Sequence, residues 1–276
     1  MTHNSQENHF IEIENVTHYY QYNVPAIEKI NMKVKKGEFV CILGPSGCGK
    51  STLMTILSGL MLNSEGRVKV NGQDVYANGK IAYQPHVGYV FQEHRLLPWK
   101  TVEQNIIFAM KAMGIPKEKW ASTLDQYLSM LQIKQFRNSW PLNLSGGQRQ
   151  RVSIARALAT DPEFILMDEP FSGLDEVTAR FMREELLGIW KRTEKTIIFV
   201  THSIREAIYL ADRIFIFTKS PGKIYKVLDI DVLRPRRYED LSLAEIEAEI
   251  VNDVLVHWGM EAQIKQEKQL LAELNG

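Results

Sequence analysis

The residues best suited to chemistry form a glycine-rich segment near the start of this 276-residue chain. The segment matches the phosphate-loop pattern G-x-x-x-x-G-K-[ST] at every fixed position. Its residues are Gly44, Pro45, Ser46, Gly47, Cys48, Gly49, Lys50 and Ser51. Glycines let backbone N–H groups turn toward phosphate oxygens. Lys50 supplies a cation for the β- and γ-phosphates, and Ser51 supplies an oxygen for Mg²⁺.

The context of this loop agrees with the motif. Residues 39–43 are apolar and predict a buried strand, while residues 52–60 are apolar at helical spacing. A phosphate loop requires this order of strand, loop and helix. The alternative, a glycine-rich turn with a chance lysine, leaves both flanking patterns unexplained.

Two adjacent carboxylates follow a second apolar stretch. Residues 164–167 predict a buried strand that ends in Asp168 and Glu169. Because neighbouring side chains on a strand point in opposite directions, the two carboxylates require different roles. We expect Asp168 to hold Mg²⁺ through water and Glu169 to orient and polarise the attacking water. An acidic strand end that faces solvent is the alternative.

A second candidate phosphate receptor lies at residues 144–151, which read Leu-Ser-Gly-Gly-Gln-Arg-Gln-Arg. Ser145 and Gln148 predict a capping box, and Gly146 and Gly147 leave bare N–H groups at the positive end of a helix. One chain cannot easily bring two such receptors to one nucleotide. A symmetric pair of subunits, each offering this helix end to the ATP of its partner, solves the problem. A capped helix with a glycine hinge is the alternative.

Composition limits the function classes. Lys and Arg together number 33, and Asp and Glu together also number 33. Because these charges balance, the chain has no global basic field for nucleic acid. No apolar run approaches the ~18 residues that span a bilayer, and residues 1–8 have no signal-peptide core. Cys41 and Cys48 have the spacing of neither a metal site nor a disulfide framework, and we expect both to be reduced.

Hydrophobic patterns predict alternating strands and helices, and therefore a largely parallel sheet covered on two sides. The expected strands are 10–16, 30–34, 39–43, 66–70, 87–91, 164–167, 196–200, 214–217 and 224–228. The expected helices are 52–60, 101–113, 116–131, 145–160 and 175–193, with a further helix capped by Ser203 and Glu206. Asn71-Gly72 predicts a hairpin turn, and residues 74–86 give no clear prediction.

The end of the chain differs in composition. Near residues 234–237 the alternation stops, and Ser242 with Glu245 opens a long helical pattern toward Leu274. We expect a domain over residues 1–235, with a helical region at about 93–160, and a C-terminal helical extension over 236–276. The extension is expected to pack on its own domain, with a dimer or regulatory contact as the alternative.

Residues 144–148, taken with the phosphate loop and Asp168-Glu169, resemble the LSGGQ signature of the ATP-binding subunits of ABC transporters. The resemblance covers nearly the whole chain. It implies an α/β fold with a RecA-like P-loop NTPase core, an antiparallel β region at the N-terminus and an inserted α-helical subdomain. It also implies a cytoplasmic, membrane-peripheral ATPase that binds ATP and Mg²⁺ as a homodimer and drives a separate permease, together with a substrate-binding protein.

The same resemblance implies further site residues. Gln92 matches the glutamine that the family uses near Mg²⁺ and the membrane partner, and Thr52 extends the phosphate loop. Asp175, in the segment Ser-Gly-Leu-Asp, matches the D-loop, and His202 matches the histidine that contacts the γ-phosphate. Tyr20 stands where the family stacks an aromatic ring on adenine.

Each of these residues has an ordinary alternative. Gln92 could be a turn residue, His202 a neighbour of a helix cap and Tyr20 a core residue. Tyr19 and Tyr22 compete with Tyr20 for the adenine.

A finer resemblance is to the importers of nitrate, sulfonates and taurine. It is carried by Leu-Pro-Trp at 97–99, Thr-Val at 101–102 and Ser-Pro-Gly-Lys-Ile at 220–224. Two features depart from that family: Ser203 replaces the usual Asp, and residues 78–86 form a longer segment. Two other functions compete, a soluble ABC ATPase that acts on DNA or ribosomes and a P-loop kinase for a small molecule.

The loop after Gln92 predicts a contact surface. Leu96, Leu97 and Trp99 surround Pro98 within residues 93–100. Three large apolar residues in a short loop suggest a partner site, which we expect to receive a short helix of the permease. Packing of these residues on the core is the alternative.

Overall fold

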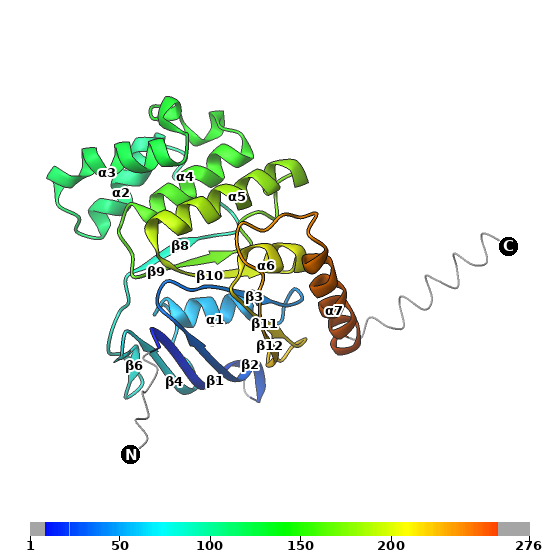
Figure 1. Ribbon diagram of the computed structural model, residues 1–276. Helices are drawn as coiled ribbons and strands as arrows, with labels where there is room; N and C mark the ends of the chain where they lie inside the picture. The colour runs from blue at the N-terminus through cyan, green and yellow to red at the C-terminus, as the bar shows by residue number, and fades with distance from the viewer. Residues whose placement is uncertain (1–8, 22, 259–276) are drawn as a thin grey trace, which may run out of the picture.

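The computed structural model describes residues 9–21 and 23–258 and arranges them as two main sheets with helices between and around them (Figure 1). The strands are β1 (Ile11–Gln21), β2 (Val24–Val34), β3 (Phe39–Leu43), β4 (Glu65–Val70), β5 (Gln73–Asp74), β6 (Tyr76–Ala77), β7 (Lys80–Ile81), β8 (Val87–Val90), β9 (Phe164–Asp168), β10 (Thr196–Thr201), β11 (Arg213–Phe217) and β12 (Ile224–Asp229). The helices are α1 (Lys50–Leu57), α2 (Val102–Ala112), α3 (Lys117–Met130), α4 (Gly146–Leu158), α5 (Glu176–Thr193), α6 (Ile204–Leu210) and α7 (Leu241–His257), with the short 3₁₀ turns η1 (Lys134–Phe136) and η2 (Pro141–Asn143). The expected α/β class is confirmed.

The larger sheet carries the candidate chemistry. Its strand order is β12-β11-β3-β10-β9-β8. All neighbours are parallel except the β11–β12 pair, which is antiparallel. This order places β3 next to β10, and β10 next to β9, so that the carboxyl ends of these three strands meet at one edge. In open parallel sheets, ligands bind beyond this edge.

The interior of the sheet is apolar on both faces, as expected for parallel strands. On β3, Phe39, Cys41 and Leu43 pack into one core, with α2 to α6. The alternate residues Val40 and Ile42 pack into a second core, with α1 and the N-terminal sheet. Both cysteines of the chain are free and buried.

The N-terminal sheet is antiparallel and has the strand order β2-β1-β4-β5. Asn71 and Gly72 have φ angles of 51° and 76° in the turn between β4 and β5, as a two-residue hairpin requires. The segment without a clear prediction forms a second small hairpin, β6–β7, whose turn residues Asn78 and Gly79 also have positive φ.

The chain between β8 and β9 is helical, and α2, α3 and α4 lie together at the top of Figure 1, away from the N-terminal sheet. The predicted capping box of α2 is present, with Thr101 and Gln104 exchanging hydrogen bonds of 3.3 and 3.1 Å. Pro116 was expected in the first turn of α3, but it occupies the N-cap, where its missing N–H costs nothing.

Helix α7 begins at Leu241, one residue before Ser242, so Ser242 lies inside the first turn and the predicted start is wrong by one position. The described part of the extension packs on the domain. Trp258 Nε1 donates to the Phe217 carbonyl at 2.9 Å, and Lys226 pairs with Glu249 at 2.9 Å. The rest of the predicted helix, toward Leu274, lies outside the described residues. Among the helices that the structure describes, none is both long and apolar enough to cross a membrane.

Candidate functional site

The glycine-rich loop joins β3 to α1, and Lys50 at its end donates hydrogen bonds back to the loop carbonyls. Gly47 and Gly49 have φ angles of 77° and 93°, which L side chains rarely adopt. A Cβ on Gly49 would also lie 2.4 Å from Ile27 Cγ2. Lys50 Nζ donates to the carbonyl oxygens of Gly44 at 2.8 Å and Pro45 at 2.9 Å. The ammonium group is therefore held over the loop, with 5% of Lys50 exposed.

The loop has no side-chain cap at the start of α1. Its N–H groups at that end, including those of Ser51 and Thr52, have no carbonyl one turn earlier in the helix to accept their hydrogen bonds. They lie at the positive end of the helix dipole and next to a lysine. This combination suits the phosphates of a nucleotide.

Two oxygen ligands meet beside the loop. Ser51 Oγ donates to Asp168 Oδ2 at 3.0 Å, from the start of α1 to the end of β9. Burial raises the pKa of the Asp168 carboxyl, and the hydrogen bond from Ser51 opposes part of that rise. A hydroxyl and a carboxylate this close fit a hard cation such as Mg²⁺. The described residues hold no group of three or more His, Cys, Asp or Glu able to bind a metal.

Glu169 stands between two potential cations. Its Oε1 lies 3.7 Å from Lys50 Nζ, and its Oε2 lies 2.9 Å from His202 Nδ1. Its φ angle is 43°, an unfavourable conformation for a residue with a side chain, and its N–H donates to the Val200 carbonyl at 2.9 Å. Local strain of this kind persists where the surrounding structure over-determines it, and it is common at catalytic positions.

Gln92 follows β8 and reaches the same group. Its Nε2 donates to Ser172 Oγ at 3.3 Å, and Ser172 Oγ donates to the Glu169 carbonyl at 3.0 Å. Ser172 is the first residue of the D-loop match, and no sequence pattern indicates a role for its hydroxyl. In the structure it connects Gln92 to the backbone of Glu169.

Tyr20 lies at the outer side of the loop. Its ring is 64% exposed, and its hydroxyl is 3.1 Å from Thr52 Oγ1. The ring also meets the edge of His18 at a centroid distance of 4.8 Å, a neighbour that sequence analysis missed. Tyr19 precedes it on the same strand and therefore points to the other face, near Glu65 and Glu28. Tyr22, the third candidate, lies outside the described residues.

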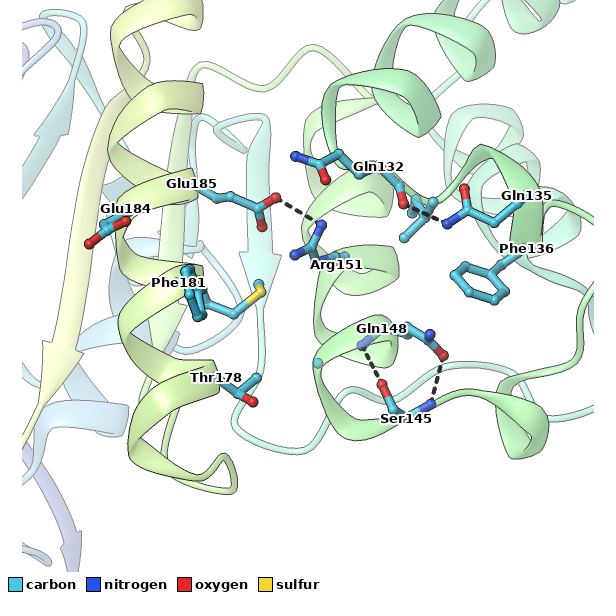
Figure 2. A pocket seen from close by; sticks show the side chains of 13 residues that line it. Gln132, Gln135, Phe136, Ser145, Gln148, Arg151, Thr178, Phe181, Glu184 and Glu185 are labelled. Atoms are coloured by element: carbon cyan, nitrogen blue, oxygen red, sulfur yellow. Dashed lines mark hydrogen bonds and ion pairs between the residues drawn. The ribbon is translucent and has the colours of Figure 1, made fainter.

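The second candidate phosphate receptor lies in a different part of the molecule. Ser145 Oγ accepts from the Gln148 N–H at 3.3 Å, and Gln148 Oε1 accepts from the Ser145 N–H at 2.8 Å, which completes the predicted capping box of α4. Next to it is a cavity of about 560 Å³ between α4, η1 and α5 (Figure 2). Its lining includes Ser145, Gly147 and Gln148 but no residue of the phosphate loop.

Gly146, predicted for this receptor, and Asp175, predicted from the D-loop match, lie at the starts of two helices. Gly146 is the first residue of α4, and a Cβ there would meet Leu174 at 3.4 Å. Asp175 caps α5, accepting from the Thr178 N–H at 3.0 Å. That hydrogen bond holds the pKa of the Asp175 carboxyl below its usual range.

One predicted capping box is incomplete. Ser203 caps α6, since its Oγ accepts from the Glu206 N–H at 3.4 Å. The Glu206 carboxylate does not return to the Ser203 N–H, which donates instead to Thr201 Oγ1 at 3.0 Å. Glu206 accepts from Thr201 and Arg183, two partners that no local spacing rule points to.

The chain is similar to known proteins over most of its length. The family model described as "ABC transporter" matches residues 27–172. An aliphatic sulfonates import ATP-binding protein of Bacillus cereus is 40% identical over 245 residues, which cover 87% of this chain and 94% of that protein. The structure of cbiO1 from Clostridium perfringens, part of the ABC transporter complex cbiONQ, has a TM-score of 0.75 and 26% identity, and the match covers 94% of this chain and 100% of that one. A dimeric ATP-binding cassette in a post-hydrolysis state, bound to ADP and Pi, has a TM-score of 0.69 and 30% identity, covering 81% of this chain and 100% of that one.

Proposed function

The chain belongs to the ABC transporter family as an ATP-binding subunit that hydrolyses ATP, and we propose that two copies drive a separate membrane permease that imports nitrate, sulfonates, taurine or a related small solute. The observation that carries the ATPase part is the meeting of Lys50, Asp168, Glu169 and His202 at one edge of the parallel sheet.

In the proposed mechanism the phosphate loop and Lys50 bind the β- and γ-phosphates, and Tyr20 stacks on the adenine. The Glu169 carboxylate accepts a hydrogen bond from the attacking water and thereby polarises that water. His202, exposed beside Glu169, donates to the γ-phosphate as negative charge develops there. Mg²⁺, held by Ser51 and Gln92 and through water by Asp168, would neutralise charge on the phosphate oxygens.

The signature segment is proposed to act in the second subunit. Ser145 and Gly147 line a cavity whose lining includes none of the phosphate-loop residues, so this helix end, with the N–H groups of Gly146 and Gly147, suits a nucleotide carried by another copy. Asp175, at the start of α5, would lie at the same interface. Two ATP molecules would then be shared by a homodimer, an arrangement for which the dimeric cassette structure gives support.

We propose a division into an ATP-binding domain over residues 1–235, with a helical subdomain at about 93–160, and an extension from 236 onward. A groove of about 350 Å³ lies between the sheet and the helical subdomain, lined by residues such as Leu97, Phe108 and Met113. Phe108 and Met113 are exposed, and Trp99, two residues after Leu97 in the chain, is 68% exposed, whereas Leu96 packs against the core. An apolar groove at this position suits a short amphipathic helix, and we propose that the permease supplies it at the cytoplasmic face of the membrane.

The substrate class rests on the relatives. The sulfonate importer subunit matches over most of both chains, and a separate binding protein would select the solute outside the cell. The balanced charge of 33 basic and 33 acidic residues gives no support to a nucleic-acid partner.

Trp99→Ala tests the coupling to a permease. The mutant subunit should keep its melting temperature and its ATPase rate when isolated, because the ring is exposed, but it should lose transport and permease co-purification. Leu233→Ala, which truncates an apolar side chain that is 88% exposed on another surface, serves as the matched control and should change neither. A large drop in melting temperature would assign Trp99 to the core, and unaltered assembly and transport would remove it from the permease contact.

A further inference from the structure

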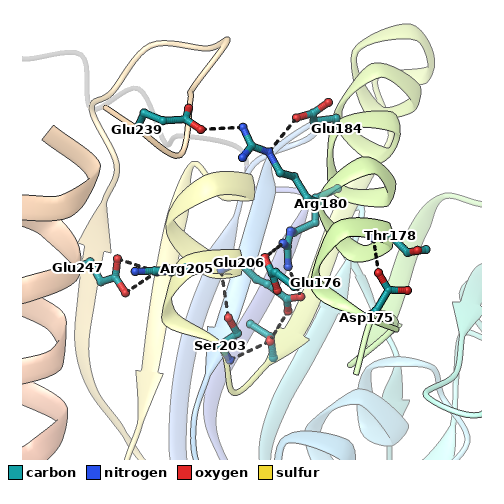
Figure 3. A network of polar contacts seen from close by, with 12 residues as sticks. Asp175, Glu176, Thr178, Arg180, Glu184, Ser203, Arg205, Glu206, Glu239 and Glu247 are labelled. Carbon is teal, nitrogen blue, oxygen red and sulfur yellow. Dashed lines mark hydrogen bonds and ion pairs between the residues drawn. The ribbon is translucent and has the colours of Figure 1, made fainter. Parts of the chain in front are cut away.

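The turn that carries His202 is flanked by Thr201 and Ser203, and hydrogen bonds connect both of these residues to Glu206 (Figure 3). Before His202, Thr201 Oγ1 donates to Glu206 Oε2 at 2.6 Å. After it, the Ser203 N–H donates to the same Thr201 oxygen at 3.0 Å, and Ser203 Oγ accepts from the Glu206 N–H at 3.4 Å. The backbone on either side of His202 is therefore fixed relative to Glu206.

The same carboxylate is anchored to another helix. Arg183, in the middle of α5, donates from Nη1 to Glu206 Oε1 at 2.9 Å. Its Nη2 donates at 2.5 Å to Oε1 of Glu176, the first residue of α5. Arg183 is 3% exposed and Glu206 8% exposed, and a charge pair buried to this degree requires good geometry to persist.

The surroundings leave Glu206 little freedom. Its Oε1 accepts from Arg183 and its Oε2 from Thr201, and because the residue is buried, the carboxylate is not placed to contact a substrate. The ring of Tyr238 covers the Arg183 guanidinium at 5.3 Å and is itself stacked on Tyr209 at 4.3 Å. Tyr238, in the segment that precedes α7, thus covers the Arg183–Glu206 pair. Glu206 can therefore influence ATP hydrolysis only through the turn that it holds.

We propose that Glu206 is a positioning residue for ATP hydrolysis, which through Thr201 and Ser203 sets the place of the His202 imidazole relative to Glu169, and through Arg183 ties that place to the start of α5. A shift of α5 would then be transmitted to His202 by hydrogen bonds alone. The inference rests on the role proposed above for His202.

Thr201→Val tests it with little change in shape. Valine matches threonine in size but removes the hydroxyl that donates to Glu206 and accepts from Ser203. We expect kcat for ATP to fall roughly tenfold, because small displacements of a catalytic group are costly, while KM stays within about twofold. Thr201→Ser keeps the hydroxyl and should recover most of the turnover.

The matched control lies on the same strand. Thr196 begins β10, is also buried, and accepts from the Gly37 N–H at 2.8 Å, far from His202. Thr196→Val removes the same group from the opposite end of the strand and should keep the parent kcat. Equal losses of kcat in the two valine variants would overturn the proposal, since both would then report a general weakening of the fold.

The decisive measurement repeats Thr201→Val in a His202→Ala background, with single-turnover release of Pi so that slow rates stay measurable. If Thr201 and Glu206 act through His202, the second substitution should cause no further loss. The same fractional loss with and without His202 would overturn the inference. A fully active His202→Ala enzyme would instead contradict the role proposed for His202, whereas an impaired His202→Ala beside a fully active Thr201→Val would contradict this inference alone.

Discussion

The two candidate phosphate receptors of this chain differ in which groups each of them has. At the phosphate loop, side chains from α1, β9 and the turn after β10 approach one another, and Lys50, Glu169 and His202 form a chain of contacts of 3.7 and 2.9 Å. At the start of α4, Ser145 and Gln148 bond to each other. Of the two arginines that follow, Arg149 donates to the Leu144 carbonyl at 2.5 Å and Arg151 is paired with Glu185 at 2.8 Å. The first receptor has a cation and a base of its own, and the second has backbone donors and a hydroxyl.

This difference suggests that one subunit binds the nucleotide and the other contributes donors to its γ-phosphate. A helix N-terminus contributes only about 0.3–1 kcal/mol to the binding of an anion at an exposed position. The signature end would therefore hold a free nucleotide weakly. It would hold one more firmly when a phosphate loop presents the γ-phosphate, so closure of the pair would depend on bound ATP.

Glu169→Gln should have the largest effect on ATP hydrolysis. It tests whether the phosphate-loop site contains its own catalytic base. The amide keeps the size of the side chain but loses the charge that polarises water, so hydrolysis should fall by about 10²–10⁴-fold. ATP affinity should remain, and the mutant should accumulate as an ATP-bound dimer on size exclusion. A turnover close to that of the parent would move the catalytic base elsewhere.

Mixing two inactive subunits tests whether the second receptor acts in the partner. Ser145→Arg puts a bulky group at the signature end and should lower turnover at least about 100-fold, as loss of transition-state donors does, with ATP binding to the monomer intact. Lys50→Ala should cripple ATP binding or turnover, since it removes a cation from the phosphates.

In a mixed dimer of these two variants, one site combines an intact loop with an intact signature. Turnover should reappear on mixing, toward half the parent rate per dimer that contains both. If both receptors serve a nucleotide within one chain, mixing will restore nothing and the comparison drawn above is broken.

Among these substitutions, Tyr20→Ala should have the smallest effect on ATP turnover. Loss of base stacking should weaken nucleotide binding by roughly 1–3 kcal/mol, with kcat little changed at saturating ATP. Tyr19→Ala is the matched control on the opposite face of β1 and should bind ATP like the parent. If Tyr19→Ala weakens binding and Tyr20→Ala does not, the ring assigned to the adenine is wrong.

Much of the fold followed from the sequence because the signals were local. The apolar run at 39–43 agrees with β3 residue for residue, and the capping boxes at Thr101 and Ser145 lie where their spacing predicted. A capping box joins residues three apart, so the chain needs no distant partner to form it. The segment at 74–86 escaped prediction because its strands are two residues long.

The sequence by itself determined which groups could bind phosphate, cation and water, since glycine, lysine, serine and carboxylate are fitted to these tasks by their own chemistry. The tertiary structure decided which of them meet. Ser51 and Asp168 are 117 positions apart, and Arg183 and Glu206 are 23 apart. Their contacts depend on the order of strands β9, β10 and β3 and on the packing of α5 against α6. Strand order is set by the burial of whole faces, so no spacing along the chain revealed that Glu206 would leave its capping box to hold the turn of His202.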